Sequence, residues 1–504
     1  MKKILITFFA LGFLFTSCEF DKGFEEMNVN PNAASQIDSA NKFTYLLTKV
    51  SGERYENWRN SLIYNSTIMQ HHAESSWWAG DKYNRNEQWT FALWERGYPQ
   101  QVKNIEDILD QLRDDGDSGT NMGIARIMRV FIYHRLTDLY GDIPYSEAGQ
   151  GYTNGILKPK YDAQQDIYMD MLKELEEAVA QIGGDSSWGS ADVVFGGSAA
   201  HWKKFGNSMM LRLAMRLTAA DPATSQAWAV KAINSGDLFD AHDHFAAIKH
   251  GDGNSGSRNG HGEVFLADRS ARISTSFMSR MDGDPRKTRL FMRRSDGSQA
   301  VADLIGMKNG LTGAAYTDLD GNEVPAVGDN SIYAEPATEL QSITNPMVMQ
   351  TAAEVKFLEA EAAIRGWTSG DAKALYEEGV TFAMKMLGHL YPTMSPITDA
   401  EISTFLAGPG AYKASGTVAE RWEQVMDQYW IATYLNEYEG FSNWRRSGYP
   451  DISPTRHPNS VTNGQFMIRM LYPTSESVNN ADSYSAAIAR QGADLYTTPV
   501  WWDQ

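Results

Sequence analysis

The sequence predicts a predominantly α-helical fold interrupted by long irregular loops and a few short β-hairpins. Three observations predict it. Apolar residues recur at helical spacing in several separate segments, glycine-rich stretches divide these segments, and an Asp-Gly pair lies between short extended runs. With 42% apolar and 12% aromatic residues among 504, the chain has the composition of a globular protein with a large core.

The first residues have the pattern of a secretory signal. Lys2 and Lys3 precede an apolar run over residues 4–15, and Cys18 follows shortly afterwards. The run fits the roughly 7–15 residues of a signal peptide and is shorter than the roughly 20 of a membrane-spanning helix. We therefore expect residues 1–17 to be removed. The alternative is a signal peptide followed by an incidental cysteine.

Cys18 is the only cysteine, which excludes a disulfide framework. Small residues before it resemble a bacterial lipobox, and this resemblance implies that the Cys18 thiol carries lipid and anchors the chain in a membrane. Residues 18–39 are polar and turn-rich and predict a tether, so residues 40–504 are expected to form a single domain. Glu19 and Asp21 favour display on the outer surface.

Several later segments predict helices that pack on two sides. The segment containing Ile124, Phe131 and Leu136 carries two apolar stripes, and similar stripes follow from residues 166 and 202. Another pattern covers residues 353–364, after which a helix beginning near Asp371 completes a helical hairpin. Small residues at the expected crossings indicate tetratricopeptide-like helix pairs, although the roughly 34-residue period of that repeat is irregular here.

Two glycine-rich stretches predict long loops on this helical scaffold. They cover residues 251–262 and 306–328. The pair Asp320-Gly321, flanked by Tyr316 and Val324, predicts a tight hairpin turn. Irregular segments on a rigid scaffold are where binding residues are usually found.

The charge balance favours a neutral ligand. The net charge is −18, and without Lys2 and Lys3 the chain carries 43 basic and 63 acidic side chains. Nucleic acid is not expected as a partner, because binding it requires clustered Lys and Arg. Highly charged acidic polysaccharides are disfavoured for the same electrostatic reason.

An aromatic loop offers a candidate sugar-binding site. A pyranose needs a flat aromatic surface for its apolar face and polar groups for its hydroxyl rim. Trp77 and Trp78 lie between Ser-Ser and Ala-Gly in a loop, whereas Trp89 and Trp94 lie among apolar residues and are predicted to be core. Because adjacent residues usually point apart, one of Trp77 and Trp78 is expected to anchor the loop and the other to face ligand. The polar fringe is predicted to come from the residues that follow: Asp81, Lys82, Tyr83, Asn84 and Arg85.

Weaker candidates lie elsewhere. Gln341 belongs to a polar run, residues 339–345, whose amides could reach sugar hydroxyls. Tyr316, beside the predicted turn, and the aromatic pair Trp501-Trp502 are further options. For each of these aromatic residues the competing interpretation is packing in the core.

Residue spacing predicts no cofactor, and it offers only one weak metal candidate. Asp318 and Asp320 form a weak calcium candidate, but the glycine is misplaced for an EF-hand and a plain Asp-Gly turn is favoured. The segments His71-His72 and His242-Asp243-His244 lack a third ligand at usable spacing, so zinc is not expected.

No motif for nucleophilic catalysis, a P-loop or dinucleotide binding is present. A surface glycosidase stays open as an alternative, because paired carboxylates are defined by their separation in space. A structural adaptor built from tetratricopeptide-like pairs is the other alternative. We predict a binding protein and no enzyme.

Several motifs, in this order, resemble the SusD/RagB family of nutrient-binding outer-membrane lipoproteins. Besides the lipobox at Cys18, they are FEEMNVNPN at 24–32, DLYGDIPYSEA at 138–148, DPR at 284–286, PMVM at 346–349 leading into AEVKFLEAE at 353–361, and NWRRSGYP at 443–450. The resemblance extends over the whole chain.

The resemblance implies an α-rich unit of tetratricopeptide-like helix pairs with an irregular ligand-binding face. It also implies a partner, a SusC-like TonB-dependent transporter, and a function in polysaccharide utilization. Combined with the charge and the aromatic loop, it predicts a surface lipoprotein that captures a neutral oligosaccharide or polysaccharide, with a glucan as one candidate, for import. A peptide or another nutrient is the alternative ligand within the same family.

Overall fold

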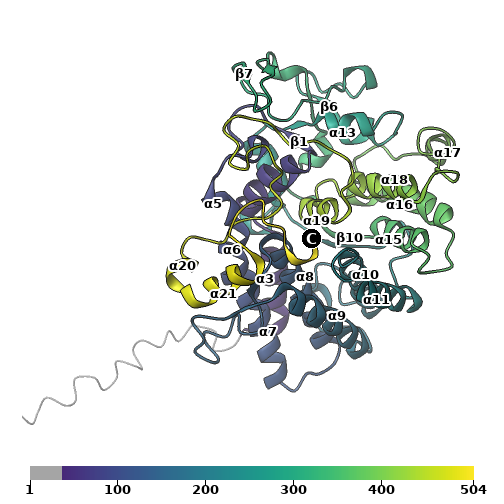
Figure 1. Cartoon of the computed structure of the whole chain (residues 1–504). Helices are drawn as coiled ribbons and strands as arrows, with labels where there is room; N and C mark the ends of the chain where they lie inside the picture. Colours follow the sequence, from purple (N-terminus) through teal and green to yellow (C-terminus); the bar gives the residue numbers. More distant parts are fainter. Residues whose placement is uncertain (1–36, 504) are drawn as a thin grey trace, which may run out of the picture.

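The computed structural model describes residues 37–503, so the predicted signal, the lipobox cysteine Cys18 and nearly all of the predicted tether lie outside the described residues. Helices dominate and strands are short, which confirms the predicted fold class (Figure 1). The longer helices are α3 Ser39–Val50, α7 Lys103–Asp114, α8 Thr120–Tyr140, α9 Gln164–Gln181, α10 Ala199–Arg216, α11 Pro222–Asn234, α15 Ala352–Ile364, α16 Ala372–Leu390, α18 Val418–Ala432, α19 Glu437–Ser447 and α21 Ala481–Gln491.

Shorter helices occupy the connections. They are α4 Arg54–Glu56, α5 Glu87–Thr90, α6 Ala92–Arg96, α12 Gly260–Ala267, α13 Thr275–Arg280, α14 Lys287–Leu290, α17 Asp399–Ala407 and α20 Glu476–Asn479. Two segments are π-helical, η1 Asn57–Ser66 and η3 Gly97–Val102. The 3₁₀ turns are η2 Gly80–Lys82, η4 Gly189–Ala191, η5 Ser255–Ser257, η6 Val301–Asp303, η7 Asn330–Ile332, η8 Thr338–Gln341 and η9 Trp501–Asp503.

The long helices pack in sequence-adjacent pairs. Helices α7 to α11 each lie against the next, and α15 lies against α16 and α18 (Figure 1). The predicted hairpin, a helix over residues 353–364 followed by one beginning near Asp371, is therefore confirmed, and the Asp371 side chain caps the start of α16. Small residues permit the close crossings: a Cβ on Gly379 would lie 2.6 Å from the Phe357 ring, and one on Gly206 2.5 Å from Val179.

The strands form antiparallel pairs only two strands wide among the described residues. The pairs are β1 His72–Ala73 with β5 Arg272–Ile273, β2 Ile143–Pro144 with β3 Tyr161–Asp162, β4 Phe245–Ile248 with β10 Met347–Thr351, β6 Phe291–Arg293 with β9 Ala334–Pro336, and β7 Tyr316–Thr317 with β8 Glu323–Val324. In the last pair Tyr316 lies opposite Val324, which is the hairpin predicted around Asp320-Gly321.

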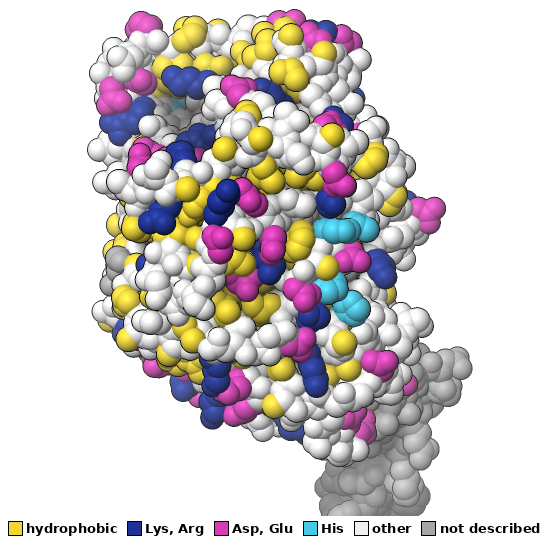
Figure 2. Space-filling model, turned by 90° about the vertical axis from the view of Figure 1, so that its right-hand side faces the viewer, with side chains coloured by type: hydrophobic (Ala, Val, Ile, Leu, Met, Phe, Trp, Pro, Cys, Tyr) yellow, Lys and Arg dark blue, Asp and Glu magenta, His cyan; other side chains and the backbone are white. Residues whose placement is uncertain are grey.

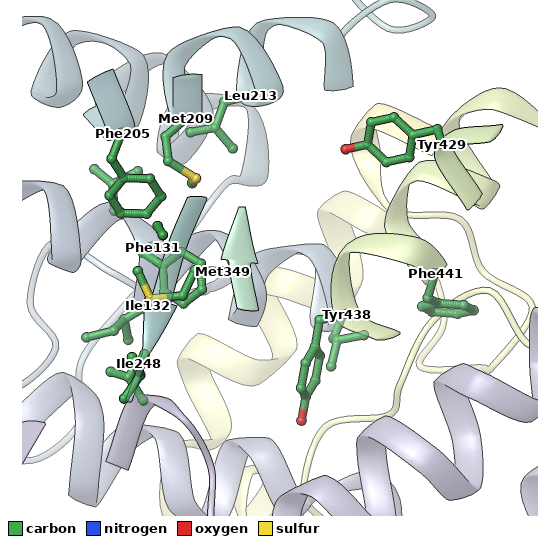
Figure 3. Packing of buried hydrophobic residues seen from close by; sticks show 14 of the residues in the cluster. Phe131, Ile132, Phe205, Met209, Leu213, Ile248, Met349, Tyr429, Tyr438 and Phe441 are labelled. Carbon is green, nitrogen blue, oxygen red and sulfur yellow. The ribbon is translucent and has the colours of Figure 1, made fainter. Parts of the chain in front are cut away.

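A large hydrophobic core joins the helix pairs. Phe131 and Ile132 of α8 meet Phe205 and Met209 of α10, and Ile248 and Met349 of the paired strands close the same region (Figure 3). These side chains are fully or nearly fully buried. The strand pair β4–β10 therefore closes the core beside the α8 and α10 helices.

The core also holds ion pairs that link motifs distant in sequence. The guanidinium of Arg446 on α19 donates two parallel hydrogen bonds to the carboxylate of Glu361 on α15, at 2.9 and 2.8 Å. Burial opposes ionisation of Glu361, but Arg446 and Arg365 prevail and lower its pKa. The motifs at 353–361 and 443–450 are thus joined inside the fold.

Candidate functional site

A short loop, residues 74–79, carries both adjacent tryptophans and connects β1 to η2. The buried carboxylate of Glu74 organises this loop, accepting hydrogen bonds from the backbone amides of Ser76 at 2.8 Å and Trp78 at 2.7 Å. Lys82 donates to the Glu74 backbone carbonyl and lies 3.3 Å from its carboxylate. Because one buried acceptor satisfies several donors, the loop is fixed without any ligand.

The two tryptophans separate into one buried and one exposed ring. Trp78 is fully buried, and its indole nitrogen donates to Oδ2 of Asp268 at 3.0 Å. The Trp77 side chain is 42% exposed. Trp78 is therefore the tryptophan that anchors the loop, and its buried ring is not open to a surface ligand. The ligand role of Trp77 stays a prediction.

Three neighbouring rings hold Trp77 edge-on. Its ring centroid lies 5.4 Å from that of Trp58, 5.5 Å from that of Trp89 and 6.3 Å from that of Trp78, with interplanar angles of 78–83°. Trp89, predicted to be core, is only half-buried, whereas Trp94 is buried as predicted. Edge-to-face packing fixes the plane of Trp77 and leaves part of its surface open to solvent.

Three residues predicted to reach sugar hydroxyls are internal. Asp81, Lys82 and Tyr83 are at most 3% exposed. Asp81 accepts from the Asn309 side chain at 2.6 Å and from the Gly310 amide at 2.7 Å, and burial raises its pKa to about 6 despite the opposing charge of Lys82. These side chains cannot reach a surface ligand, because Asn309 and Gly310 cover Asp81, Lys82 is bound to Glu74 and Tyr83 is fully buried. This corrects the sequence prediction.

The next two predicted residues lie nearer the surface. Asn84 is half-buried, and its backbone carbonyl accepts from the Tyr64 hydroxyl at 3.0 Å. Arg85 is exposed and forms an ion pair with Glu87. It borders an open cavity of about 460 Å³ lined with Phe91, among other residues.

Sequence reasoning missed a row of arginines and aromatic rings beside Trp77. The Arg54 guanidinium lies 4.6 Å from the Trp58 ring centroid, Arg59 lies 4.1 Å from that of Tyr55 and 5.8 Å from that of Trp58, and Arg96 lies 4.9 Å from that of Tyr55. Burial and then the charges of Arg54 and Arg96 lower the pKa of Arg59, while Tyr55 opposes this shift. Stacking uses the flat face of each guanidinium and leaves its N–H edge able to donate.

A sequence signal for this row exists. Arg54 and Trp58, and likewise Tyr55 and Arg59, are four residues apart, so helical spacing places each pair on one face. The backbone passes from α4 into the π-helical η1 at Asn57, and both pairs nevertheless stay in contact. Within the described residues, the Nε atom of Arg59 and the indole nitrogen of Trp58 are buried without a hydrogen-bond partner.

The weaker candidates lie on other segments. The Gln341 side chain is half-buried and donates to the Pro336 carbonyl at 2.7 Å, so its amide nitrogen is already engaged. The Tyr316 hydroxyl donates to the Gly310 carbonyl at 2.7 Å, and its ring borders an open cavity of about 510 Å³. Asp81 and Tyr316 bind the same Gly310, one through its amide and the other through its carbonyl, which connects the aromatic loop to the hairpin.

The carboxylates of the weak calcium candidate are engaged in the turn. Asp318 Oδ1 accepts from the backbone amides of Asp320 and Asn322 at 2.9 and 2.8 Å, and Asp320 pairs with Arg456 at 2.7 Å. The segment is therefore an Asp-Gly turn locked by an ion pair. Within residues 37–503, no group of three or more His, Cys, Asp or Glu side chains converges on a common point.

The fold and this exposed aromatic site define a helical binding protein. A family model described as starch-binding and associating with the outer membrane, the SusD-like type, matches residues 31–473. The chain belongs to this family, and this membership supports carbohydrate binding. In the part of the chain from 37 to 503, no helix combines the length and apolarity needed to cross a bilayer.

Solved structures support the same fold. A chitin-binding protein is 31% identical, with a TM-score of 0.81 over 92% of this chain and 100% of that chain. A SusD-like protein from Bacteroidetes is 26% identical, with a TM-score of 0.80 over 93% and 100%. A chitin-binding SusD homologue from Flavobacterium johnsoniae shares the fold at 22% identity, with a TM-score of 0.77 over 92% and 98%. None of the curated proteins matches the chain.

Proposed function

We propose that this protein captures a neutral oligosaccharide or polysaccharide at the cell surface, with Trp77 as the stacking platform. The observation that carries the proposal is the exposed Trp77 ring, held edge-on by Trp58, Trp78 and Trp89. A rigid indole loses little conformational freedom when a pyranose lies against it, and its flat apolar surface buries the C–H face of the sugar.

The arginine row supplies the polar fringe that the buried Asp81 and Lys82 do not. Guanidinium groups only donate hydrogen bonds, so the row of Arg54, Arg59 and Arg96 favours ligands with outward-facing acceptors. A hydroxyl oxygen is one such acceptor, and an acetamido carbonyl is a stronger one. Neither requires the sugar to carry a charge, which agrees with the acidic balance of the whole chain.

These acceptors suggest which neutral glycans to test first. β-Linked N-acetylglucosamine oligomers combine a flat apolar ring face with an acetamido carbonyl, and a relative that is 31% identical is a chitin-binding protein. Glucans, predicted as one candidate from the sequence, have the same ring face without the carbonyl. We rank N-acetylglucosamine oligomers first and glucans second.

Capture by this site would serve import. We propose that Cys18 is lipidated and holds the protein at the outer membrane, with which its family associates. We further propose that a SusC-like TonB-dependent transporter receives the glycan. Such delivery favours weak binding, since a tightly held ligand would not be released to the transporter.

Affinity gel electrophoresis tests the proposal. Native gels containing glycol chitin, amylose, laminarin or no polysaccharide would be run with the wild-type chain, W77A and W228A. Trp228 is a half-buried surface tryptophan on α11 and serves as the matched control. We expect at least one polysaccharide to retard the wild type and W228A, and W77A to migrate as in the gel without polysaccharide.

Two results would contradict the proposal. Equal retardation of W77A and wild type would exclude Trp77 as the platform, and retardation by no polysaccharide would favour the peptide alternative. An assay for reducing ends, run on the same mixtures, distinguishes binding from cleavage. An increase with time would identify a glycosidase.

A further inference from the structure

Two histidines from distant parts of the chain meet on the surface. His242 lies in the loop between α11 and β4, and His389 lies in the last turn of α16. Nδ1 of His242 is 3.1 Å from Nε2 of His389. Figure 2 shows histidine side chains gathered in two neighbouring groups on one face of the molecule. A second pair, His201 and His244, has ring centroids 5.7 Å apart.

The helix α16 fixes the position of the first pair. Phe382 and His389 are seven residues apart and so lie on the same face of α16, two turns from each other. The His242 ring packs across both, with its centroid 5.2 Å from that of His389 and 6.4 Å from that of Phe382. Both histidines remain partly open to solvent. The two ring nitrogens are therefore held together and are accessible.

The spacing of the two nitrogens suits a divalent transition metal. Imidazole is a preferred ligand of Zn²⁺, Ni²⁺ and Cu²⁺. If a metal lay about 2.05 Å from each of these two nitrogens, which are 3.1 Å apart, the N–metal–N angle would be about 98°. That angle lies between the right angle of square-planar sites and the wider angle of tetrahedral ones. In the absence of metal, one ring donates its N–H to the other.

The charges nearby favour a cation. Asp243 is exposed and adjacent to His242, and Asp240 in the same loop pairs with His244 at 2.8 Å and with Lys204 at 3.1 Å. On the α16 side, Lys385 lies one turn before His389, and its ammonium is paired with Asp399 at 2.8 Å. The lysine closest in sequence to His389 is thus neutralised by its own partner.

We propose that His242 and His389 chelate one divalent transition-metal ion of the Zn²⁺, Ni²⁺ and Cu²⁺ class. The described residues supply these two ligands, which leaves the other coordination positions of the metal to water or to a donor group on another molecule. The site lies on different elements from the aromatic loop and does not depend on glycan binding. Spacing in the sequence did not reveal it, because its two ligands are 147 residues apart.

Isothermal titration of the full chain in detergent, prepared without a histidine tag, tests this site. CuCl₂ and ZnCl₂ would be titrated into the wild type, H242A, H389A and the matched controls H201A and H244A. We expect the wild type and both controls to bind one equivalent. H242A and H389A should each lose roughly tenfold or more in affinity, since even loss of an outer-shell partner costs about 10–100-fold.

A spectroscopic measurement identifies the ligands independently of affinity. The electron paramagnetic resonance spectrum of the Cu²⁺-loaded wild type should show coupling to two imidazole nitrogens, and each of H242A and H389A should lose that pattern. Three results would overturn the proposal: no binding by the wild type, wild-type affinity in H242A and H389A, or loss of binding in H201A or H244A instead. Thermal unfolding of each variant confirms that it is folded.

Discussion

The indole nitrogen of Trp78 donates a 3.0 Å hydrogen bond to Oδ2 of Asp268, the residue that ends α12. This bond ties the aromatic loop to the end of a helix 190 residues further along the chain. Among the described residues, the indole of the adjacent Trp77 has no comparable hydrogen bond, and Trp77 is 42% exposed. The two adjacent tryptophans thus have separable effects, one on stability and the other on the exposed surface.

Replacing Trp78 by Phe should destabilise the protein by about 1–3 kcal/mol, because the smaller ring loses the hydrogen bond to Asp268 and leaves a cavity at a fully buried position. Urea unfolding followed by circular dichroism measures the change. W77F is the matched control, and as a partly exposed substitution it should stay within about 0.5 kcal/mol of the wild type. Equal stability of W78F and wild type would show that the hydrogen bond does not anchor the loop.

Replacing Arg59 by Gln should weaken binding of an N-acetylated glycan by roughly three- to tenfold, the equivalent of one hydrogen bond. The Arg59 guanidinium lies 4.1 Å from the Tyr55 ring centroid, in the row beside Trp77, and is only partly buried. Binding to chito-oligosaccharides would be measured by isothermal titration. The control is R113Q, an exposed arginine of α7 paired with Asp110. An equal loss in both variants would point to overall charge and not to this site.

Replacing Arg446 by Met should cost about 3–5 kcal/mol of unfolding free energy, because the carboxylate of Glu361 then lies buried without its bidentate partner. Chemical denaturation provides the measurement. The protein that remains folded should bind glycan as the wild type does, since this pair lies between α15 and α19. Normal stability combined with lost binding would instead place Arg446 in the ligand site.

Asp81 should make stability depend on pH between about 4 and 6. Burial raises its pKa to about 6, so the folded state holds its proton more tightly than the unfolded chain does. Its contribution is therefore complete below pH 4 and is lost as the pH rises through about 6, a change of about 3 kcal/mol. Unfolding free energies at pH 4 and 7 should differ less in D81N than in wild type. D114N, at the exposed carboxylate that ends α7, should keep the wild-type difference, and an unchanged difference in D81N would refute the assignment.

Helical periodicity was sufficient to predict the scaffold. The apolar stripes around Phe131 and at residues 353–364 predicted helices buried on two sides. In the structure these segments are the buried helices α8 and α15. The Asp320-Gly321 turn was predictable because hairpins of this kind need a residue with positive φ, and Gly321 has φ 84°. Local chemistry determines both features.

The candidate site was harder to predict because it depends on contacts between distant segments. Composition placed Asp81 and Lys82 in a polar loop, but Asn309 and Gly310 cover that loop from more than 220 residues away. The burial of Trp78 likewise depends on Asp268. Arg54 and Arg59 did carry a local signal, because each lies four residues from an aromatic residue. Their position beside Trp77 could not be predicted from this spacing and is known only from the structure.

The buried carboxylate of Glu74 holds the backbone around Trp77 in a single shape. A receptor with such a rigid loop loses little conformational entropy when it binds its ligand. Association and dissociation can then both be fast. It also has little freedom to adapt. A sugar whose ring cannot lie parallel to the fixed indole plane would therefore not bind. Discrimination between glycans would then come from the orientation of one immobile plane.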